Sequence, residues 1–283
     1  MNFVWSGPWS ETIKTALYQD IGRGDMTTNA IVPAGQKAEA VLVAREDLVV
    51  CGLPVVAEVF SLLDNRVRML PESRDGGGVR AGNVICTLSG PARALLTGER
   101  VALNFFQNLS AVATLTRRFV EQVAGTNAQI VDTRKTTPGL GQLQKYAVRI
   151  GGGRNHRMGL DDGVLIKENH IALAGGVTEA IKRVEESVCH LHRIQVECES
   201  LEQVREALNA GAQAILLDNM DMETLRRAVD IAGGKALLEA SGSMTLETVR
   251  EVAETGVDLI SVGAITHSAG SKDVSLLVKM PNP

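Results

Sequence analysis

The last third of the chain repeats one pattern, in which a short apolar run is followed by an amphipathic stretch and then by a glycine. Leu201, Val204 and Leu208 fall on one face of the stretch Leu201 to Asn209, which predicts a helix with one buried side. Apolar runs that alternate with such helices are typical of strands in a parallel sheet. The predicted strands are Arg193 to Cys198, Ala214 to Leu217, Lys235 to Leu238 and Leu259 to Val262, with earlier ones at Gln129 to Asp132 and Val164 to Lys167.

The ends of the predicted helices are marked by glycine and threonine. Gly211, Gly233 and Gly256 stand where helices commonly end in a left-handed conformation. The hydroxyl of Thr245 is expected to cap the N-terminus of a helix from Leu246 to Glu254.

Polar or small residues follow four of these strands at the same phase of the repeat. Glu197, Asp218, Ser241 and Gly263 are separated by 21, 23 and 22 residues. In parallel α/β barrels the ligand site lies at the carboxyl ends of the strands. These four positions are therefore predicted to converge on one pocket.

The first hundred residues show a different sequence pattern. Short alternating segments, Ala38 to Ala44 and Val79 to Leu88, are separated by Gly and Pro, including the run Gly76 to Gly78, which predicts a sheet-rich domain with tight turns. A long helical pattern from about Pro91 to Ala124 would bridge this domain to the repeat. We expect two domains, because 283 residues exceed one typical core.

Composition and charge exclude several classes of partner. An apolar fraction of 45% and a charged fraction of 22% are ordinary for a globular protein. The formal charge of -4 gives no field that would attract nucleic acid or an anionic membrane. No stretch approaches the roughly 20 apolar residues of a membrane span, and Met1 to Gly7 lacks the start of a signal peptide.

Cysteine usage points to a reducing compartment. None of the four cysteines forms the close doublet of a zinc or thiol-redox site, so all are expected to be buried thiols and the protein to be cytoplasmic. They are Cys51, Cys86, Cys189 and Cys198.

The middle of the chain is locally basic. Between Arg134 and His170 there are seven Lys and Arg residues against three acids, a local excess of +4. A solvated basic face is the alternative interpretation. It is disfavoured because Arg134 and Lys135 follow the apolar run Gln129 to Val131 and Lys167 follows Val164 to Ile166, so these cations stand at strand ends, where a barrel places its site.

A glycine-rich stretch, Gly151 to Gly153, is followed closely by His156 and Arg157. Glycines allow backbone to approach a ligand, although such a triplet is more often a flexible turn. Arginine binds a carboxylate or phosphate through two parallel hydrogen bonds. Together these residues predict an anion site.

Glu197 and Asp218 are acids in a pocket that is otherwise basic. Mg²⁺ uses few protein ligands and shares the rest of its coordination with phosphates and water, so two carboxylates could hold it. The alternative is that the acids pair with Lys135 and Lys167. Near them, the segments Ser241 to Ser243 and Gly263 to Ala264 are predicted to offer backbone N–H groups beside helix N-termini, which favours phosphate.

Several segments carry a resemblance to a known family. In order and spacing they resemble the signature of quinolinate phosphoribosyltransferases over nearly the whole chain. The segments are Asp20 to Thr28, Thr97 to Asn104, Asp132 to Leu140, Lys145 to Val148, Gly151 to Arg157, Leu165 to His170, Leu217 to Met220, Glu239 to Gly242 and Gly256 to Ala264.

The resemblance implies an incomplete α/β barrel with an N-terminal α/β sandwich domain. The sandwich would span residues 1–112, joined by 270–283, and the barrel 113–269. It also implies a homodimer, or a higher oligomer built from it, in which Arg100 enters the partner's active site. Within one subunit, Arg134, Lys135, His156, Arg157 and Lys167 would hold the quinolinate carboxylates, Glu197 and Asp218 would face Mg²⁺ and the ribose, and Ser241, Gly242, Gly263 and Ala264 would contact phosphate.

The implied reaction converts quinolinate and phosphoribosyl pyrophosphate to nicotinate mononucleotide, pyrophosphate and CO₂ in de novo NAD biosynthesis. Lys135, Glu197 and Asp218 would be its catalytic residues. The cations would gather two anions and stabilise charge on the departing pyrophosphate. No pyridoxal, thiamine or covalent intermediate is expected, because the cationic ring nitrogen accepts the electrons of decarboxylation.

Two rival functions remain open at this stage. Lys135 or Lys167 at a strand end could serve as the Schiff-base nucleophile of a lyase or aldolase. Alternatively, the barrel could be inactive and only bind phosphorylated ligands.

Two local features stand apart from the implied site. Gly141 departs from the family, which commonly has an arginine after Pro-Gly-Leu, and this affects the expected loop contacts. Asp161 and Asp162 precede an apolar run and are interpreted as a turn, because the acidic doublet of the other large phosphoribosyltransferase class follows one.

Overall fold

The computed structural model describes residues 9–279, which fall into two compact units. The first contains residues up to 115, together with 137–151 and the stretch from 268, and the second contains 116–136 and 152–267. The sequence motif considered at Met1 to Gly7 lies outside the described residues. The expected domain ranges placed 137–151 in the barrel domain, whereas this segment belongs to the first unit, as do the short stretches 113–115 and 268–269 at the expected boundaries.

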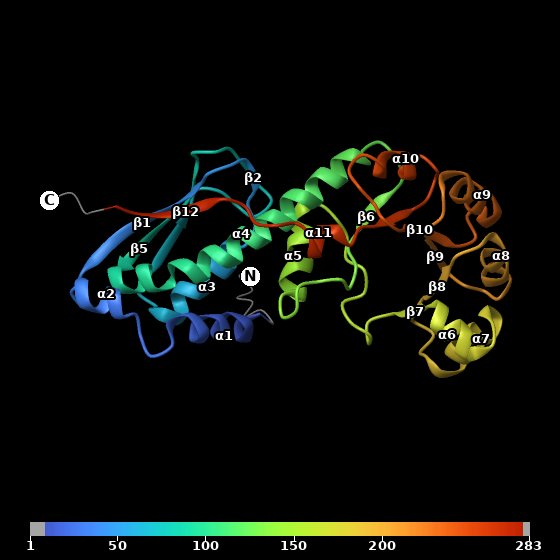
Figure 1. Cartoon of the computed structure of the whole chain (residues 1–283), viewed down its shortest axis with the longest axis horizontal. Helices are drawn as coiled ribbons and strands as arrows, with labels where there is room; N and C mark the ends of the chain where they lie inside the picture. The colour runs from blue at the N-terminus through green and yellow to red at the C-terminus, as the bar shows by residue number, and fades with distance from the viewer. Residues whose placement is uncertain (1–8, 280–283) are drawn as a thin grey trace. The chain divides into compact units, whose positions relative to one another are not determined.

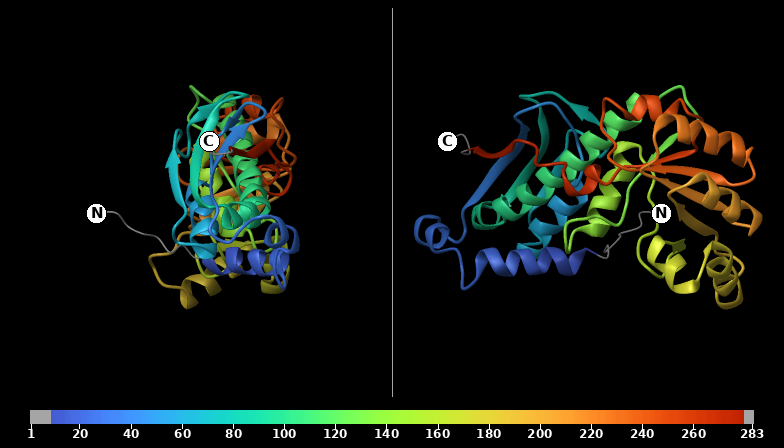
Figure 2. Two further views of the ribbon diagram at one scale, coloured as in Figure 1. Left: turned by 90° about the vertical axis from the view of Figure 1, so that its left-hand side faces the viewer. Right: turned by 45° about the vertical axis from the view of Figure 1, so that its right-hand side comes forward.

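The first unit is built on a four-stranded antiparallel sheet in the order β12-β1-β5-β3. The last described strand therefore lies beside the first one, which is visible in Figures 1 and 2. A two-stranded pair, β2-β4, completes its β-structure. The strands are β1 Lys37–Ala44, β2 Leu48–Val49, β3 Arg68–Pro71, β4 Gly78–Val79, β5 Val84–Pro91 and β12 Val274–Lys279.

Helices cover this sheet and bury its apolar side chains. Gly98 lies in the long helix α4 at a close approach to α3, where an added Cβ would come within 2.8 Å of Phe60. The helices are α1 Ser10–Ile21, α2 Met26–Ile31, α3 Leu53–Leu63, the first part of α4 Ala92–Gln122, and α5 Gly141–Gly151. The single long helix predicted from Pro91 to Ala124 is thus confirmed, and its residues belong to both units.

Helix α5 belongs to the first unit because its polar contacts lie there. Tyr146 donates a hydrogen bond of 2.6 Å to Asp75, and the Gln144 amide lies 3.4 Å from the Asn108 side chain. Hydrogen bonds between residues so distant in sequence cannot be inferred from the local hydrophobic pattern, which explains the different domain range.

The second unit contains six parallel strands in the order β6-β11-β10-β9-β8-β7. They are β6 Gln129–Val131, β7 Val164–Ile166, β8 Ile194–Cys198, β9 Ala214–Asp218, β10 Leu237–Ser241 and β11 Leu259–Ser261. Strands β6 and β7 are the two edges of the sheet, so the barrel is not closed. This confirms the predicted incomplete α/β barrel.

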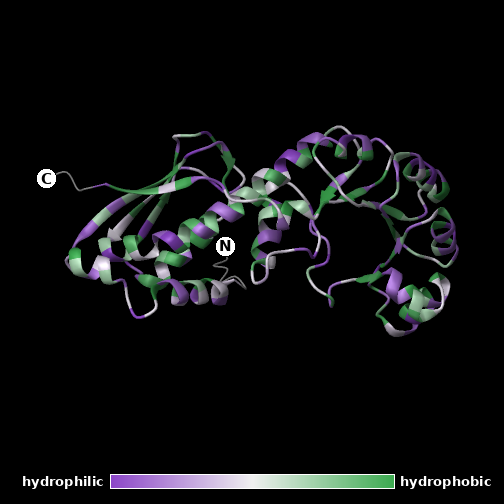
Figure 3. Ribbon diagram, in the orientation of Figure 1, coloured by the Kyte–Doolittle hydropathy of each residue, from purple (hydrophilic) through white to green (hydrophobic). Residues whose placement is uncertain are grey.

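Helices lie on the outer side of this curved sheet (Figure 1). Figure 3 shows the strands as largely hydrophobic and the helices as carrying both hydrophobic and hydrophilic residues, as expected for amphipathic helices that cover a sheet. The helices are α6 Glu168–Ala174, α7 Val177–Ser187, α8 Leu201–Asn209, α9 Met222–Ala232, α10 Val249–Ala253 and α11 Ala264–His267.

Two predicted element bounds were wrong. Strand β10 begins at Leu237 instead of Lys235, because Gly233 and Gly234 both adopt positive φ and lengthen the turn before it. Helix α10 begins at Val249, so Thr248 and not Thr245 occupies the N-cap position, without a capping hydrogen bond from its side chain. The Thr245 and Thr248 hydroxyls each accept from the other's backbone N–H, at 3.3 and 3.2 Å, which holds the preceding residues in a turn.

Candidate functional site

A cavity of about 720 Å³ opens at the carboxyl ends of the barrel strands. Eleven of the twelve predicted site residues line it, although they come from seven different strand ends and loops. They are Arg134, Lys135, His156, Arg157, Lys167, Glu197, Asp218, Ser241, Gly242, Gly263 and Ala264. Arg100 is the exception, since it is an exposed residue of α4 within the first compact unit.

The pairing of the strands explains how these side chains converge. Glu197 and Glu239 are both in register with Leu216, so the three lie in one row across β8, β9 and β10. Asp218 and Ser241 pair one layer further toward the carboxyl ends. Because side chains two residues apart on a strand share a face, each inward position adds a residue to the same cavity.

The loop after β6 places two cations at the mouth of the cavity. The Lys135 backbone N–H donates to Thr133 Oγ1 over 3.0 Å, and its carbonyl accepts from Thr266 Oγ1 over 2.7 Å. A Cβ on Gly263 would lie 3.4 Å from Lys135 Cδ and 3.2 Å from His267 Nε2. Glycine at this position therefore leaves room for both side chains.

Asp132 organises the segment that carries His156 and Arg157. Its carboxylate is fully buried and accepts from Asn155 Nδ2 over 2.6 Å and from the His156 N–H over 2.8 Å. Arg154 forms a parallel bridge with Val131, so the segment runs beside β6. This arrangement fixes the backbone from which both predicted side chains extend.

The glycine triplet does not serve as predicted. Among the described residues, Gly151 to Gly153 do not line the cavity. Gly151 ends α5, and Gly152 adopts φ +97° where the chain turns toward β6. The triplet therefore allows a turn, and the interpretation of its backbone as a ligand-binding loop was wrong.

Two arginines share one end of the cavity. Burial, and secondly the charge of Arg134, lower the pKa of Arg157 from its ordinary value. Arg157 donates from Nη1 to the Gly163 carbonyl over 2.8 Å, while its buried Nε has no hydrogen-bond partner among residues 9–279. Two neighbouring cations with a donor to spare form a site suited to a carboxylate or phosphate.

The acids of the site have different partners. Lys167 Nζ lies 2.5 Å from Glu197 Oε2, so the alternative that these acids pair with lysines is correct for this pair. Asp218 instead accepts from Asn219 Nδ2 over 2.7 Å. Asn219 adopts a left-handed φ of 53°, and an added Cβ on Gly242 would lie 3.1 Å from its Oδ1.

The two predicted phosphate turns differ in structure. Gly263 and Ala264 stand at the start of α11. Ser241 and Gly242 end β10, but α10 begins only at Val249, so the expectation of a helix N-terminus beside them was wrong. The reason is the turn formed by Thr245 to Thr248, which delays the helix.

Sequence analysis missed two buried polar residues of the barrel. Glu239, which is 1% exposed, and Gln195, which is 8% exposed, lie inside β10 and β8. Gln195 Nε2 donates to Glu239 Oε2 over 2.9 Å, and its Oε1 lies 3.1 Å from His156 Nε2. Glu239 was visible as one acid in an otherwise apolar predicted strand region, which was the available signal.

This chain of contacts defines the tautomer of His156. Its Nδ1 accepts from the Arg157 backbone N–H over 2.7 Å, so this nitrogen carries no proton. Since Gln195 donates its amide to Glu239, its Oε1 is the acceptor for a proton on His156 Nε2. Both ring nitrogens are engaged by the protein, so the expectation that the imidazole grips a substrate carboxylate is not favoured.

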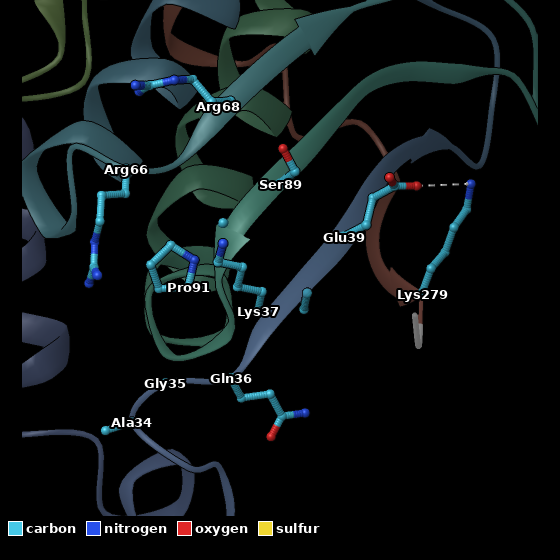
Figure 4. Close-up of a pocket in the computed structure, with 12 residues that line it drawn as sticks. Ala34, Gly35, Gln36, Lys37, Glu39, Arg66, Arg68, Ser89, Pro91 and Lys279 are labelled. Carbon is cyan, nitrogen blue, oxygen red and sulfur yellow. Dashed lines mark ion pairs between the residues drawn. The ribbon is translucent and has the colours of Figure 1, made fainter. Parts of the chain in front are cut away.

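A larger cavity, of about 1120 Å³, lies in the first unit (Figure 4). Four of its charged side chains have partners close by. Lys279 lies 3.7 Å from Glu39, Arg66 lies 2.7 Å from Asp64, and Arg68 donates to the Asn65 carbonyl over 2.8 Å. Figure 4 shows both arginines extending away from the Glu39–Lys279 pair. This cavity contains none of the predicted site residues. The barrel cavity is therefore the candidate functional site.

Other findings bear on ligands and surroundings. Across residues 9–279, no group of three or more His, Cys, Asp and Glu side chains is placed to hold a metal ion. No helix within that range is long and apolar enough to span a membrane.

All four cysteines are free, and three are buried, but Cys189 is exposed. The expectation that every cysteine is buried was therefore wrong, because Cys189 lies on the surface after α7.

Comparison with known proteins agrees with this site. Residues 25–110 and 112–277 match the family models for the N-terminal and C-terminal domains of quinolinate phosphoribosyl transferase. The chain is 46% identical over 264 residues to a probable nicotinate-nucleotide pyrophosphorylase [carboxylating] of Bacillus subtilis (strain 168), covering 93% of this chain and 91% of the relative. A Mycobacterium leprae (strain TN) relative named nicotinate-nucleotide pyrophosphorylase [carboxylating] is 44% identical, with 94% and 95% covered.

Solved structures show the same architecture. The nicotinate-nucleotide pyrophosphorylase of Ehrlichia chaffeensis is 44% identical, has a TM-score of 0.92 and is covered over 100% of its chain and 97% of this one. That of Francisella tularensis is 39% identical, with a TM-score of 0.92 and 96% of each chain covered. Two family models that together span most of the sequence, and relatives well above 40% identity, show that this chain belongs to the quinolinate phosphoribosyltransferase family.

Proposed function

We propose that the barrel cavity joins quinolinate to phosphoribosyl pyrophosphate and releases pyrophosphate and CO₂, giving nicotinate mononucleotide for de novo NAD biosynthesis. The observation that carries this proposal is the concentration of cations in one cavity. Arg134, Lys135, Arg157 and Lys167 line it together, beside two acids. Such a site attracts two multiply charged anions and holds them close enough to react.

The arginines at one end suit the dicarboxylate. Arg157 offers a buried Nε without a partner among the described residues, and its pKa is lowered by burial and, secondly, by the charge of Arg134. An anion between them would relieve that repulsion and form charge-assisted hydrogen bonds of about 1.5–3 kcal/mol each. In this arrangement Lys135 and Lys167 would complete the carboxylate pocket and stabilise charge on the departing pyrophosphate.

The acids and turns of the cavity suit the phosphoribosyl group. Asp218 and Glu197 provide carboxylate oxygens there, which are the donors that Mg²⁺ prefers. Bound Mg²⁺ would neutralise pyrophosphate as it leaves. Glu197 is held by Lys167, so this acid would serve the cation and the lysine together. Ser241, Gly242, Gly263 and Ala264 would contact phosphate from the turns that they form.

The finer biological setting belongs to the same proposal. We expect a homodimer, or a higher oligomer built from it, with Arg100 completing a partner's site, because this exposed arginine stands in the family segment Thr97 to Asn104. A cytoplasmic location is supported by four free cysteines. No nucleic acid or membrane partner is proposed.

Neither rival function has an observation in its favour. Lys167 is engaged by Glu197, which does not favour a role as a free nucleophile. An inactive barrel would not need to keep four cations and two acids on one cavity. The test is to mix the purified chain with quinolinate, phosphoribosyl pyrophosphate and Mg²⁺ and to measure pyrophosphate and CO₂ separately. Absence of pyrophosphate release, or absence of CO₂ release, would contradict the proposal.

A further inference from the structure

Glu239 is a buried carboxylate with one oxygen left open. Its Oε2 accepts from Gln195 Nε2 over 2.9 Å, and its Oε1 is buried with no hydrogen-bond partner among residues 9–279. The residue is 1% exposed. A buried polar atom without a partner costs free energy, so such an atom in a binding cavity indicates an interaction that forms only with the ligand.

The side chain of Glu239 is held in place by neighbours from other elements. Gln195 on β8 forms hydrogen bonds with both Glu239 and His156. The Arg157 backbone N–H donates to Nδ1 on the other side of the imidazole. These hydrogen bonds hold Glu239 through Oε2 and leave Oε1 without a partner among residues 9–279. The chain of hydrogen bonds therefore keeps Oε1 available.

The surroundings of Glu239 join two cavities. It lines the substrate cavity and also a second one of about 340 Å³ below it in the barrel. Asn155, His192 and Gln195 line this second cavity, so its wall is partly polar and suits water. Glu239 thus has a polar space on its far side when the substrate cavity is filled.

Glu239 lies beside the segment that carries Arg157 of the proposed dicarboxylate end, and other titratable groups stand near it. His156 Nε2 lies 3.7 Å from Glu239 Oε2, and Arg157 is the next residue along the chain. On the strands, Glu197 stands in the same row and Asp218 one layer above. A bare carboxylate oxygen beside a bound carboxylate would be repelled, whereas two carboxylates that share a proton are not.

We propose that Glu239, once the dicarboxylate is bound, carries a proton on Oε1 and delivers it to the ring carbon that loses CO₂. This inference rests on the proposed function. The bond between ring carbon C2 and its carboxylate breaks, the electron pair stays on C2, and CO₂ leaves. The Oε1–H bond then breaks, its proton forms the new C2–H bond, and Glu239 is left as a carboxylate.

Proton delivery by Glu239 determines whether the decarboxylation goes forward or reverses. A carbanion without a proton source recaptures the neighbouring CO₂ and returns to the dicarboxylate. Glu239 then regains a proton from water through the second cavity. Pyrophosphate release precedes this step and needs no proton from Glu239, so the two products report on different parts of the site.

The test compares pyrophosphate and CO₂ release by Glu239→Gln, which keeps the side-chain size and an acceptor for Gln195 but has no proton to deliver. We expect pyrophosphate release within a few-fold of the unmodified protein, CO₂ release slowed by roughly 100-fold or more, and accumulation of the dicarboxylate mononucleotide. Glu223→Gln, the same change at an exposed residue of α9, should leave both rates unchanged.

Three outcomes would overturn the proposal. They are an unchanged rate of CO₂ release, an equal loss of both products, and a failure of Glu239→Asp to release CO₂ faster than Glu239→Gln. The aspartate variant retains the acid, so its rate of CO₂ release still tests the proposal if the glutamine variant folds poorly. Absence of pyrophosphate release by the unmodified protein would instead contradict the proposed function.

Discussion

Lys167 Nζ and Glu197 Oε2 lie 2.5 Å apart, which ties the residue after β7 to a residue of β8. The lysine side chain is 47% exposed and the glutamate side chain 12%. Because the lysine is nearly half exposed, solvent screens the pair, and such pairs typically contribute only about 0–1 kcal/mol to stability. The pair instead places one cation and one acid side by side in the substrate cavity.

Removing the charge of Glu197 should weaken Mg²⁺ binding. Glu197→Gln keeps the size of the side chain but gives the cation a weaker ligand. We expect the Mg²⁺ concentration for half-maximal rate to rise about tenfold, which corresponds to about 1.4 kcal/mol. The measurement is the initial rate against Mg²⁺ at fixed substrate, with Glu202→Gln on the exposed side of α8 as the matched control. An unchanged Mg²⁺ requirement would remove Glu197 from the proposed metal ligands.

Arg157 should determine affinity for the dicarboxylate. Arg157→Ala removes charge-assisted hydrogen bonds of about 1.5–3 kcal/mol each, so we expect the KM for quinolinate to rise by roughly 10- to 100-fold. The KM for phosphoribosyl pyrophosphate should change less. Steady-state kinetics with each substrate varied in turn provides the measurement. Arg205→Ala, at an exposed position of α8, should leave both constants as they are.

Asp132 should matter for both stability and activity. Asp132→Asn exchanges an acceptor oxygen for a donor that faces the Asn155 amide or the His156 N–H. Leaving these buried groups poorly paired costs about 1–3 kcal/mol. We expect a lower midpoint of denaturation and a loss of quinolinate affinity, measured by urea unfolding and by kinetics. Full stability together with full activity would show that Asp132 does not organise the segment.

Arg100 provides a test of shared sites. If it acts in a partner's site, Arg100→Ala and Lys135→Ala should each be inactive alone. After the two variants are unfolded and refolded together, half of the dimers should be mixed, with one site of two intact. About a quarter of the activity of the unmodified protein should therefore return. Recovery of no activity, with dimers demonstrated by sedimentation, would mean that Arg100 acts within its own subunit, and full activity of Arg100→Ala alone would mean that it is not needed for catalysis.

The cysteines should differ sharply in reactivity. Burial raises the pKa of the Cys86 and Cys198 thiols to about 12 and raises that of Cys51 well above its usual range. The thiolate is the reactive form, so at pH 8 these three should resist alkylation while the exposed Cys189 reacts. Mass spectrometry after iodoacetamide treatment should find one modification per native chain and four per denatured chain. Rapid modification of Cys86 would contradict the buried assignment.

The local hydrophobic pattern was enough to locate most elements of the barrel. Helix α8 has the predicted bounds, and β8, β9 and β11 differ from prediction by one residue or less at each end. The reason is that strand and helix periods are properties of neighbouring residues. The bounds failed at β10 and α10, where two glycines and two threonines formed turns that the apolar pattern does not encode.

The sequence by itself determined which residues end the strands, and parallel packing then brings Lys135, Glu197 and Asp218 to one cavity. Only the tertiary structure decided how His156 is used, because its partner Gln195 lies 39 residues away and Glu239 lies 44 residues beyond that. The only local signal for Glu239 was that it is a single acid in an apolar region, and this signal does not indicate what the side chain contacts. Its open oxygen exists because hydrogen bonds between distant elements hold the side chain, and only folding brings those elements together.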